Sequence, residues 1–190
     1  MKKIIVVDFG SKTYQLILST LEELKVGYVK TDHTLKLEDI NEEIAGIILS
    51  GSPDNISDGE GFRLIDERIF DANVPILGIC YGHQLSNYLL GGKVIKSNTP
   101  ENGLVNFRII NDCPLFKDMP NSQLVHMSHN DEVVELGSSF EKVGETKDCN
   151  YAASYSKDKN IYTLQFHPEY DDNTCGKQYF INFLKICKLN

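Results

Sequence analysis

Apolar residues in the first half of the chain form short continuous runs that alternate with stretches of helical spacing. The continuous runs predict strands at residues 4–7, 28–30, 44–49 and 76–79. Apolar positions at helical spacing predict helices at residues 14–24, 37–44, 62–70 and 84–90. This alternation predicts an α/β fold with a doubly wound, mostly parallel sheet, and such sheets bind ligands at the carboxyl ends of their strands.

The pattern changes after residue 92, where short stretches are rich in β-forming residues. These predict strands at residues 93–96, 103–110, 123–127, 132–136, 151–155 and 161–166. We expect them to form an additional small sheet that is mixed or antiparallel. Asn173 is expected to cap a final helix, whose apolar stripe extends to Cys187.

The length and composition of the chain fit one domain. Its 190 residues, of which 41% are hydrophobic, suffice for one sizeable core. Because no repeat, low-complexity tract or linker interrupts the pattern, we expect a single domain over residues 1–190. The apolar run at residues 4–7 is too short for a signal peptide or a membrane span, so we expect a cytoplasmic protein without a membrane partner.

Charge and metal-ligating residues argue against several other classes of function. The formal net charge of -8 argues against a nucleic-acid partner, since phosphate binding needs clustered lysine and arginine. The five cysteines include no Cys-x-x-Cys pair, which argues against a disulfide framework and a structural zinc site. His126 and His129 are spaced i, i+3, but no carboxylate or cysteine joins them at ligand spacing, so no metal site is expected.

The apolar run at residues 76–79 ends abruptly at Cys80, which has a glycine on each side. Gly78 and Gly82 each lie two residues from Cys80, and helical spacing follows from Gln84. Since glycines let strand and helix backbones approach closely, this pattern predicts a sharp strand-to-helix turn that presents a nucleophile. A thiol at a helix N-terminus is favoured as its thiolate, because the helix dipole stabilises an anion there. The structural alternative is a small apolar cysteine in the core.

A cysteine nucleophile needs a base, and the base needs an orienting group. The candidate bases are His33, His83, His126, His129 and His167. His167 has the best context, because it follows the predicted strand at 161–166 and precedes Glu169 by two residues. In extended backbone these two side chains project to the same side, so the carboxylate can reach the imidazole nitrogen that faces away from the sulfur. Cys80, His167 and Glu169 are therefore the predicted catalytic residues.

These two segments resemble the signatures of a known family. Residues 78–84 (Gly-Ile-Cys-Tyr-Gly-His-Gln) and 165–169 (Gln-Phe-His-Pro-Glu) are similar to the paired motifs of the class I, or triad, glutamine amidotransferases, and the resemblance extends over residues 1–190. Within that family, Tyr81 and residues 127–131 (Met-Ser-His-Asn-Asp) resemble the GMP synthetase branch. The resemblance implies a flavodoxin-like doubly wound sheet with an additional mixed sheet, consistent with the pattern above.

The resemblance also implies an activity and a role for each matching residue. Cys80 would attack the side-chain amide of glutamine, His167 would transfer the proton, and Glu169 would orient His167, so that ammonia leaves and water clears a glutamyl thioester. The backbone N–H groups of Ser52 and Tyr81 match the family's oxyanion hole. Positions that match the substrate-binding residues are Gly51, Gln84, Ser128, His129, Asn130 and Asp131.

Two residues depart from the family pattern. Ser52 stands where the family usually has glycine, so an oxyanion peptide that required positive φ would be strained by about 1 to 3 kcal/mol. Asn130 stands where the GMP synthetase branch usually has glycine, and asparagine tolerates the left-handed region best among the other residues.

The resemblance further implies glutamine as substrate and a synthetase as partner. An ATP-pyrophosphatase subunit that aminates XMP to GMP would receive the ammonia. Because the chain lacks a Gly-rich, Lys-containing phosphate loop, ATP and Mg²⁺ are expected on that partner, and no cofactor is expected here. The alternatives are the glutaminase subunit of anthranilate or aminodeoxychorismate synthase and a γ-glutamyl hydrolase, against which residues 128–131 argue. A weakly active domain that binds glutamine or a partner as a regulator is a further alternative, because of Ser52.

Overall fold

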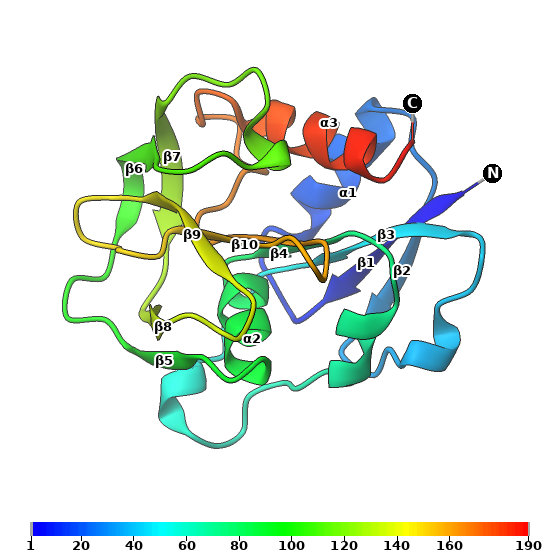
Figure 1. Cartoon of the computed structure of the whole chain (residues 1–190), viewed down its shortest axis with the longest axis horizontal. Coiled ribbons are helices and arrows are strands. Elements are labelled where there is room, and N and C mark those ends of the chain that lie inside the picture. Colours follow the sequence, from blue (N-terminus) through cyan, green and yellow to red (C-terminus); the bar gives the residue numbers. More distant parts are fainter. Residues whose placement is uncertain (1, 190) are drawn as a thin grey trace.

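The computed structural model describes residues 2–189 and shows an α/β fold built around one large sheet (Figure 1). Within these residues, nine strands form the sheet in the order β2-β1-β3-β4-β11-β10-β9-β6-β7. The strands are β1 (Lys3–Asp8), β2 (Tyr28–Asp32), β3 (Ile44–Leu49), β4 (Ile76–Ile79), β6 (Asn102–Ile109), β7 (Ser122–Ser128), β9 (Glu141–Glu145), β10 (Ala153–Ser156) and β11 (Ile161–Leu164).

The first part of this sheet is parallel, as the alternating pattern predicts. The four pairs from β2 through β1, β3 and β4 to β11 are all parallel. The predicted runs at 4–7, 44–49 and 76–79 all lie inside strands. Because β4 lies between β3 and β11, the segments that follow these three strands meet at one edge of the sheet.

Most strands of the second half extend this sheet instead of forming a separate one. β10, β9, β6 and β7 continue it from β11 in antiparallel pairs. Among the described residues, only β5 (Lys93–Lys96) and β8 (Asp131–Glu135) form the additional small antiparallel sheet. β9 was not predicted, because its sequence Glu-Lys-Val-Gly-Glu has little apolar content and only its pairing with β10 and β6 makes it a strand.

Three α-helices occur in residues 2–189: α1 (Tyr14–Glu23), α2 (Tyr81–Leu89) and α3 (Gly176–Ile186). Four short 3₁₀ segments accompany them: η1 (Leu37–Asp39), η2 (Ile56–Asp58), η3 (Glu67–Asp71) and η4 (Pro114–Phe116). The predictions of helices at 14–24 and 84–90 are confirmed, although α2 begins three residues earlier, directly after Cys80.

The predicted helices at 62–70 and 37–44 are wrong. Residues 62–66 are irregular, and only η3 follows, because the Asp66 side chain accepts from the Arg68 N–H as an N-cap and also from the distant Leu37 N–H at 3.2 Å, so the helical segment starts only at Glu67. Residues 37–44 form the single turn η1, since β3 already takes up Ile44 at its first position. In both places a contact with a distant segment competes with the helical spacing.

The predicted capping role of Asn173 is also wrong. α3 begins at Gly176, with Cys175 as the N-cap residue. The Asn173 amide instead accepts from the His126 N–H at 2.8 Å and donates to the carbonyl of His167 at 2.9 Å. Asn173 therefore joins β7 to the segment after β11.

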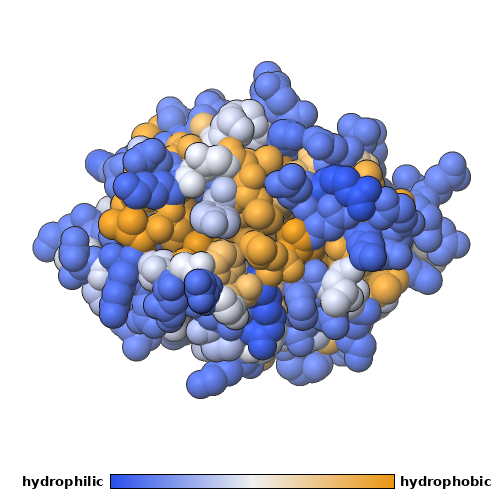
Figure 2. Space-filling view, turned by 90° about the horizontal axis from the view of Figure 1, so that it is seen from below, coloured by the Kyte–Doolittle hydropathy of each residue, from blue (hydrophilic) through white to orange (hydrophobic). Residues whose placement is uncertain are grey.

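Two apolar cores lie on opposite faces of the parallel strands, with α1 and α3 on one side and α2 on the other (Figure 1). Ile4 and Val6 of β1 belong to the core that includes α1 and α3, whereas Ile5 and Val7 belong to the core that includes α2, as the alternation along a strand requires. Figure 2 shows the molecule from the α2 side, where apolar side chains form a patch bordered by hydrophilic ones.

No helix within residues 2–189 combines the length and the apolar character that a bilayer crossing needs.

Candidate active site

The turn from β4 into α2 has the predicted strained geometry. Cys80 joins the two elements with φ 52° and ψ -101°, a positive φ that non-glycine residues rarely adopt. A Cβ atom on Gly78 would stand 2.6 Å from the carbonyl oxygen of Gly82, so the turn requires glycine there. The Cys80 N–H donates to the carbonyl of Leu164 at 2.7 Å, which fixes the turn to the end of β11. These contacts confirm the elbow and hold the thiol at the carboxyl edge of the sheet.

The thiol of Cys80 is largely buried among polar groups. Its Sγ atom lies 3.6 Å from the carbonyl oxygen of Ser128 and 3.7 Å from the side-chain amide of Gln165, which donates to it. Gln165 itself is fully buried and accepts from the Gln84 amide at 3.1 Å. Gln165 begins the 165–169 motif, but its sequence position alone predicted no role for its side chain.

His167 and Glu169 follow β11 and form the predicted pair. The His167 Nδ1 atom lies 2.7 Å from Glu169 Oε1, and both side chains are buried. Burial alone lowers the pKa of the His167 imidazole, but the Cys80 sulfur and the Glu169 carboxylate act in the opposite direction and raise this pKa well above its usual value. The surroundings of His167 therefore favour the protonated form of its imidazole.

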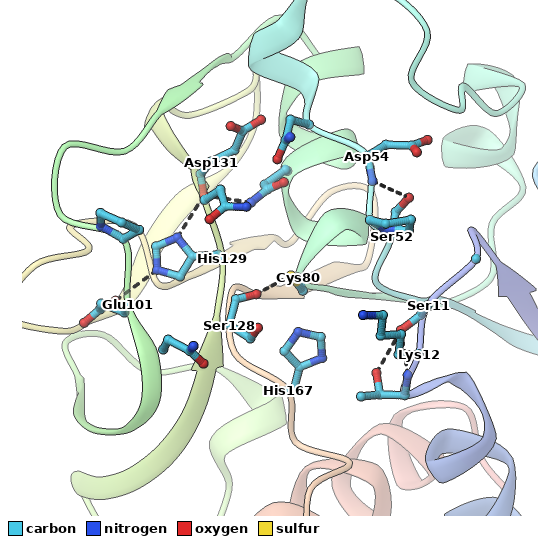
Figure 3. A pocket seen from close by; sticks show the side chains of 18 of the residues that line it. Ser11, Lys12, Ser52, Asp54, Cys80, Glu101, Ser128, His129, Asp131 and His167 are labelled. Atoms are coloured by element: carbon cyan, nitrogen blue, oxygen red, sulfur yellow. Dashed lines mark hydrogen bonds and ion pairs between the residues drawn. The ribbon is translucent and has the colours of Figure 1, made fainter.

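A pocket of about 530 Å³ opens beside these residues. Figure 3 shows Cys80 and His167 at its centre, with Ser128, His129 and Asp131 on one wall and Ser11, Lys12 and Ser52 on the other. The predicted site residues in its lining are Ser52, Cys80, Gln84, Ser128, His129, Asn130, Asp131 and His167. Gly51 lies behind this lining, where an added Cβ would stand 3.2 Å from His167 Cε1.

Several of the predicted substrate-binding side chains are held by internal hydrogen bonds. The Asp131 carboxylate accepts from the N–H of Ser57 at 2.8 Å and from its hydroxyl at 2.6 Å. The Asp131 carbonyl accepts from the Gln84 amide at 2.8 Å and lies 2.9 Å from His129 Nδ1. Asp131 thus fastens the 128–131 turn to η2 and α2. The part that Ser57 plays in this contact was not predicted from the sequence. The backbone of Asn130 does not require positive φ.

The two predicted oxyanion-hole residues lie on opposite sides of Cys80 in the fold. Tyr81 is the first residue of α2, and Ser52 follows β3. Within residues 2–189, neither backbone N–H has a hydrogen-bond acceptor. Ser52 does not adopt positive φ, and its hydroxyl donates to the carbonyl of Phe9 at 2.9 Å and accepts from the Asp54 N–H at 3.1 Å. The serine side chain therefore ties the loop after β3 to the loop after β1.

Two of the other candidate bases lie away from the thiol. His83 is fully buried, contacts Thr163 Oγ1 at 2.8 Å, and has a pKa lowered to about 3 by burial and by the nearby His129. His126 stacks on Tyr170 and pairs with Asp172 at 2.9 Å. Both imidazoles are thus held by partners outside the group of Cys80, His167 and Glu169.

Within residues 2–189, the fold brings together one group of potential metal ligands whose sequence spacing does not reveal it. Single ligand atoms of Glu101, His129 and Cys149 lie within 4.8 Å of one another. His129 Nε2 already contacts Glu101 Oε2 at 3.2 Å, and Thr146 donates to the other carboxylate oxygen at 2.7 Å. Burial raises the pKa of the Cys149 thiol far above its usual value, which disfavours the thiolate that a metal needs. The cluster is a hydrogen-bonded pair beside a neutral thiol.

The chain is similar to known amidotransferases along nearly its whole length. A family model described as "Glutamine amidotransferase class-I" matches residues 5–187. A "GMP synthase [glutamine-hydrolyzing]" of Bacillus licheniformis is 43% identical over 182 residues, which are 95% of this chain and 35% of that protein. Its counterpart in Listeria innocua is 42% identical over 98% of this chain and 36% of that protein. The chain thus spans about a third of the length of these relatives.

Solved structures show the same fold in proteins of similar length. The crystal structure of a proposed GMP synthase subunit from Thermoplasma acidophilum has a TM-score of 0.86 and 29% identity, covering 99% of this chain and 94% of that one. A glutamine amidotransferase from Thermotoga maritima has a TM-score of 0.71 at 18% identity, covering 98% and 82% of the two chains, and shows the fold alone.

Proposed function

Because the chain belongs to the class I glutamine amidotransferase family, we propose that it hydrolyses glutamine, with Cys80 as nucleophile, His167 as base and Glu169 as the orienting group. The observation that carries this proposal is the buried His167–Glu169 pair, joined at 2.7 Å, beside a thiol held at a strained strand-to-helix turn. Nucleophile, base and orienting group are the three parts that acyl transfer to sulfur requires.

In the first half of the reaction, the Cys80 thiolate attacks the side-chain amide carbon of glutamine and the carbonyl oxygen becomes an oxyanion. The carbon–nitrogen bond then breaks as the His167 imidazolium gives its proton to the leaving nitrogen. Ammonia departs and a glutamyl thioester remains. The raised pKa of His167 supports this step, because the imidazole holds the proton that the leaving group needs.

In the second half, neutral His167 takes a proton from a water molecule, whose oxygen attacks the thioester carbon. The carbon–sulfur bond breaks, glutamate leaves, and the thiolate and imidazolium are restored. The unpaired N–H groups of Ser52 and Tyr81 would stabilise the oxyanion in both halves. The wall formed by Gln84 and residues 128–131 would hold the amino-acid end of the substrate.

The test is the release of ammonia and glutamate from glutamine by the purified chain. Cys80→Ala should abolish release while leaving the fold intact, because it removes the nucleophile and little volume. Cys175→Ala, which changes a half-buried cysteine away from the pocket, is the matched control and should retain wild-type activity. Substantial hydrolysis by Cys80→Ala would overturn the assignment, and a wild type that stays inactive also with the cognate synthetase, ATP and XMP would favour the regulatory alternative.

We propose that the released ammonia passes to a separate ATP-dependent synthetase that converts XMP to GMP. That partner would bind ATP and Mg²⁺. The similarity to GMP synthases along 95% of this chain, and to a subunit of similar length, supports this acceptor. Since the chain carries a net charge of -8, we expect a basic docking face on the partner and weaker activation as salt rises.

This acceptor is tested separately from the glutaminase chemistry. Ammonia release is measured with and without the cognate synthetase, ATP and XMP, and again with a chorismate-aminating synthase as the competing system. Stimulation by the XMP system supports the proposal. Stimulation only by the chorismate system, or full activity in the isolated chain, would contradict it while leaving the catalytic residues in place.

A further inference from the structure

The carboxylate of Glu169 has a second hydrogen-bond donor besides His167. Thr13, in the loop between β1 and α1, places its hydroxyl 2.6 Å from Glu169 Oε1, the same oxygen that contacts His167. Thr13 and Glu169 are separated by 156 residues in the chain, and both side chains are buried. The contact therefore joins the first loop of the sheet to the catalytic carboxylate.

The surrounding hydrogen bonds determine which way the Thr13 hydroxyl points. An ionised carboxylate only accepts, so Thr13 is the donor. The Ser11 hydroxyl lies 2.8 Å from Thr13 Oγ1 and can donate to the lone pair that remains there. The Thr13 N–H in turn donates to Ser11 Oγ at 3.1 Å, which closes the loop on itself. Ser11, Thr13, Glu169 and His167 thus form one directed chain of hydrogen bonds.

The Thr13 hydroxyl is not used for the role that its position in the helix favours. Thr13 is the N-cap residue of α1, where threonine normally accepts from a free N–H of the first helical turn, yet this side chain makes no capping bond. A local preference given up at a buried site indicates a function elsewhere in the fold.

The surroundings of the other Glu169 carboxylate oxygen, Oε2, show how much the carboxylate depends on the hydrogen bond from Thr13. Glu169 Oε2 is buried and has no hydrogen-bond partner within residues 2–189. The charge of Glu169 is therefore stabilised through Oε1 alone, by His167 and Thr13. Without the hydroxyl, one donor would remain for a buried carboxylate, and nothing would favour Oε1 over Oε2 as the partner of His167.

We propose that Thr13 is a positioning residue for the catalytic triad: its hydroxyl holds the Glu169 carboxylate so that Oε1 faces His167 Nδ1. The imidazole is then held with its Nε2 atom toward the sulfur of Cys80. This role rests on the proposed glutaminase reaction, in which His167 must carry a proton from the nucleophile side of the ring to the leaving nitrogen.

The experiment compares Thr13→Val, which keeps the shape without the hydroxyl, with Thr13→Ser, which keeps the hydroxyl. Thr13→Val should lower kcat for glutamine hydrolysis at least tenfold with KM changed less than twofold, because Thr13 acts on the triad and not on the substrate. Thr13→Ser should retain kcat within about threefold of the wild type. Thr20→Val is the matched control, since the Thr20 hydroxyl donates to the Leu16 carbonyl within α1, and it should leave kcat unchanged.

A spectroscopic measurement separates positioning from a merely structural effect. The His167 Nδ1 proton, identified by its loss in His167→Ala, should give a low-field NMR signal that shifts in Thr13→Val and returns in Thr13→Ser. Ser11→Ala should shift the same NMR signal in the same direction but by less. This variant replaces Thr13→Val in the test if Thr13→Val does not fold. Wild-type kcat and an unshifted signal in Thr13→Val, or equal losses in the valine and serine variants, would overturn the proposal. If the wild type did not hydrolyse glutamine even with the cognate synthetase, ATP and XMP, the reaction would be refuted, while the signal would still decide whether Thr13 acts on His167.

Discussion

Gly82 packs so closely on Leu49 that a Cβ atom added to the glycine would stand 2.5 Å from the leucine carbonyl oxygen. The first turn of α2 therefore lies directly against the end of β3. This contact sets the position of the whole elbow, because the Gly82 N–H also donates to the carbonyl of Ser50 at 3.1 Å. The nucleophile and the loop that carries Ser52 are thus held at a fixed separation.

Gly82→Ala should disrupt this arrangement. We expect the free energy of unfolding to fall by about 1 to 3 kcal/mol, since backbone atoms must move to admit the methyl group, and glutamine hydrolysis to fall with it. Gly27→Ala is the control, because its Cβ would meet only the Lys3 side chain at 3.4 Å. Denaturant unfolding of both variants is the measurement, and equal stability of the two would contradict the packing argument.

His167→Ala and Glu169→Ala should lower kcat unequally. Loss of the base removes the proton transfer itself, which accounts for about 10²- to 10⁴-fold in such reactions, whereas loss of the carboxylate removes orientation and charge stabilisation. We therefore expect the larger fall for His167→Ala. Steady-state kinetics with glutamine test this order, and comparable activity in both variants would point to a different base.

Ser52 offers a test of how the oxyanion loop works. Ser52→Ala removes the hydroxyl that ties this loop to Phe9, and Ser52→Gly removes the tether and also frees the backbone. If glycine-like freedom limits oxyanion stabilisation, Ser52→Gly should exceed Ser52→Ala in kcat by about tenfold, with similar KM values. Lower kcat in Ser52→Gly than in Ser52→Ala would show that the stiffer backbone helps the site.

His83 should make the folded state sensitive to acid. Burial lowers the pKa of its imidazole to about 3, from 6.5 in the absence of such effects. The unfolded chain therefore takes up this proton at a higher pH than the folded chain, so stability falls as the pH decreases below 6.5. Between about pH 6.5 and about pH 4.5, the wild type should lose about 2 kcal/mol more unfolding free energy than His83→Asn.

The asparagine amide can keep a contact with Thr163 but does not titrate in this range. Denaturant unfolding at both pH values measures the difference between wild type and variant. Parallel pH dependence of the two proteins would show that His83 is not the group responsible.

The central part of the fold could be predicted because its signals are local. The apolar runs in β1, β3 and β4 are continuous, and the glycines around Cys80 lie within two residues of it. His167 and Glu169 are also two residues apart, so their pairing depends on backbone that the 165–169 motif itself contains. Short-range patterns of this kind survive folding because few distant contacts compete with them.

The errors lie where distant contacts decide the backbone. Residues 62–66 have helical spacing, yet the Asp66 carboxylate accepts from the Leu37 N–H and the helical segment starts only at Glu67. Asn173 has the composition of a helix cap, yet the backbone of His126 and His167 takes its side chain. Each of these residues had one local and one long-range use for its hydrogen-bonding groups, and the sequence displays only the local one.

The sequence by itself determined the strand-to-helix elbow at Cys80, the pairing of His167 with Glu169 and the parallel first half of the sheet. Only the tertiary structure decided that Gln165 contacts the sulfur and that Thr13 contacts Glu169, over separations of 85 and 156 residues. It also decided that the later strands extend the main sheet. The physical reason is that apolar periodicity and turn chemistry act between near neighbours, whereas buried polar groups take whichever partners the assembled chain brings within hydrogen-bonding distance.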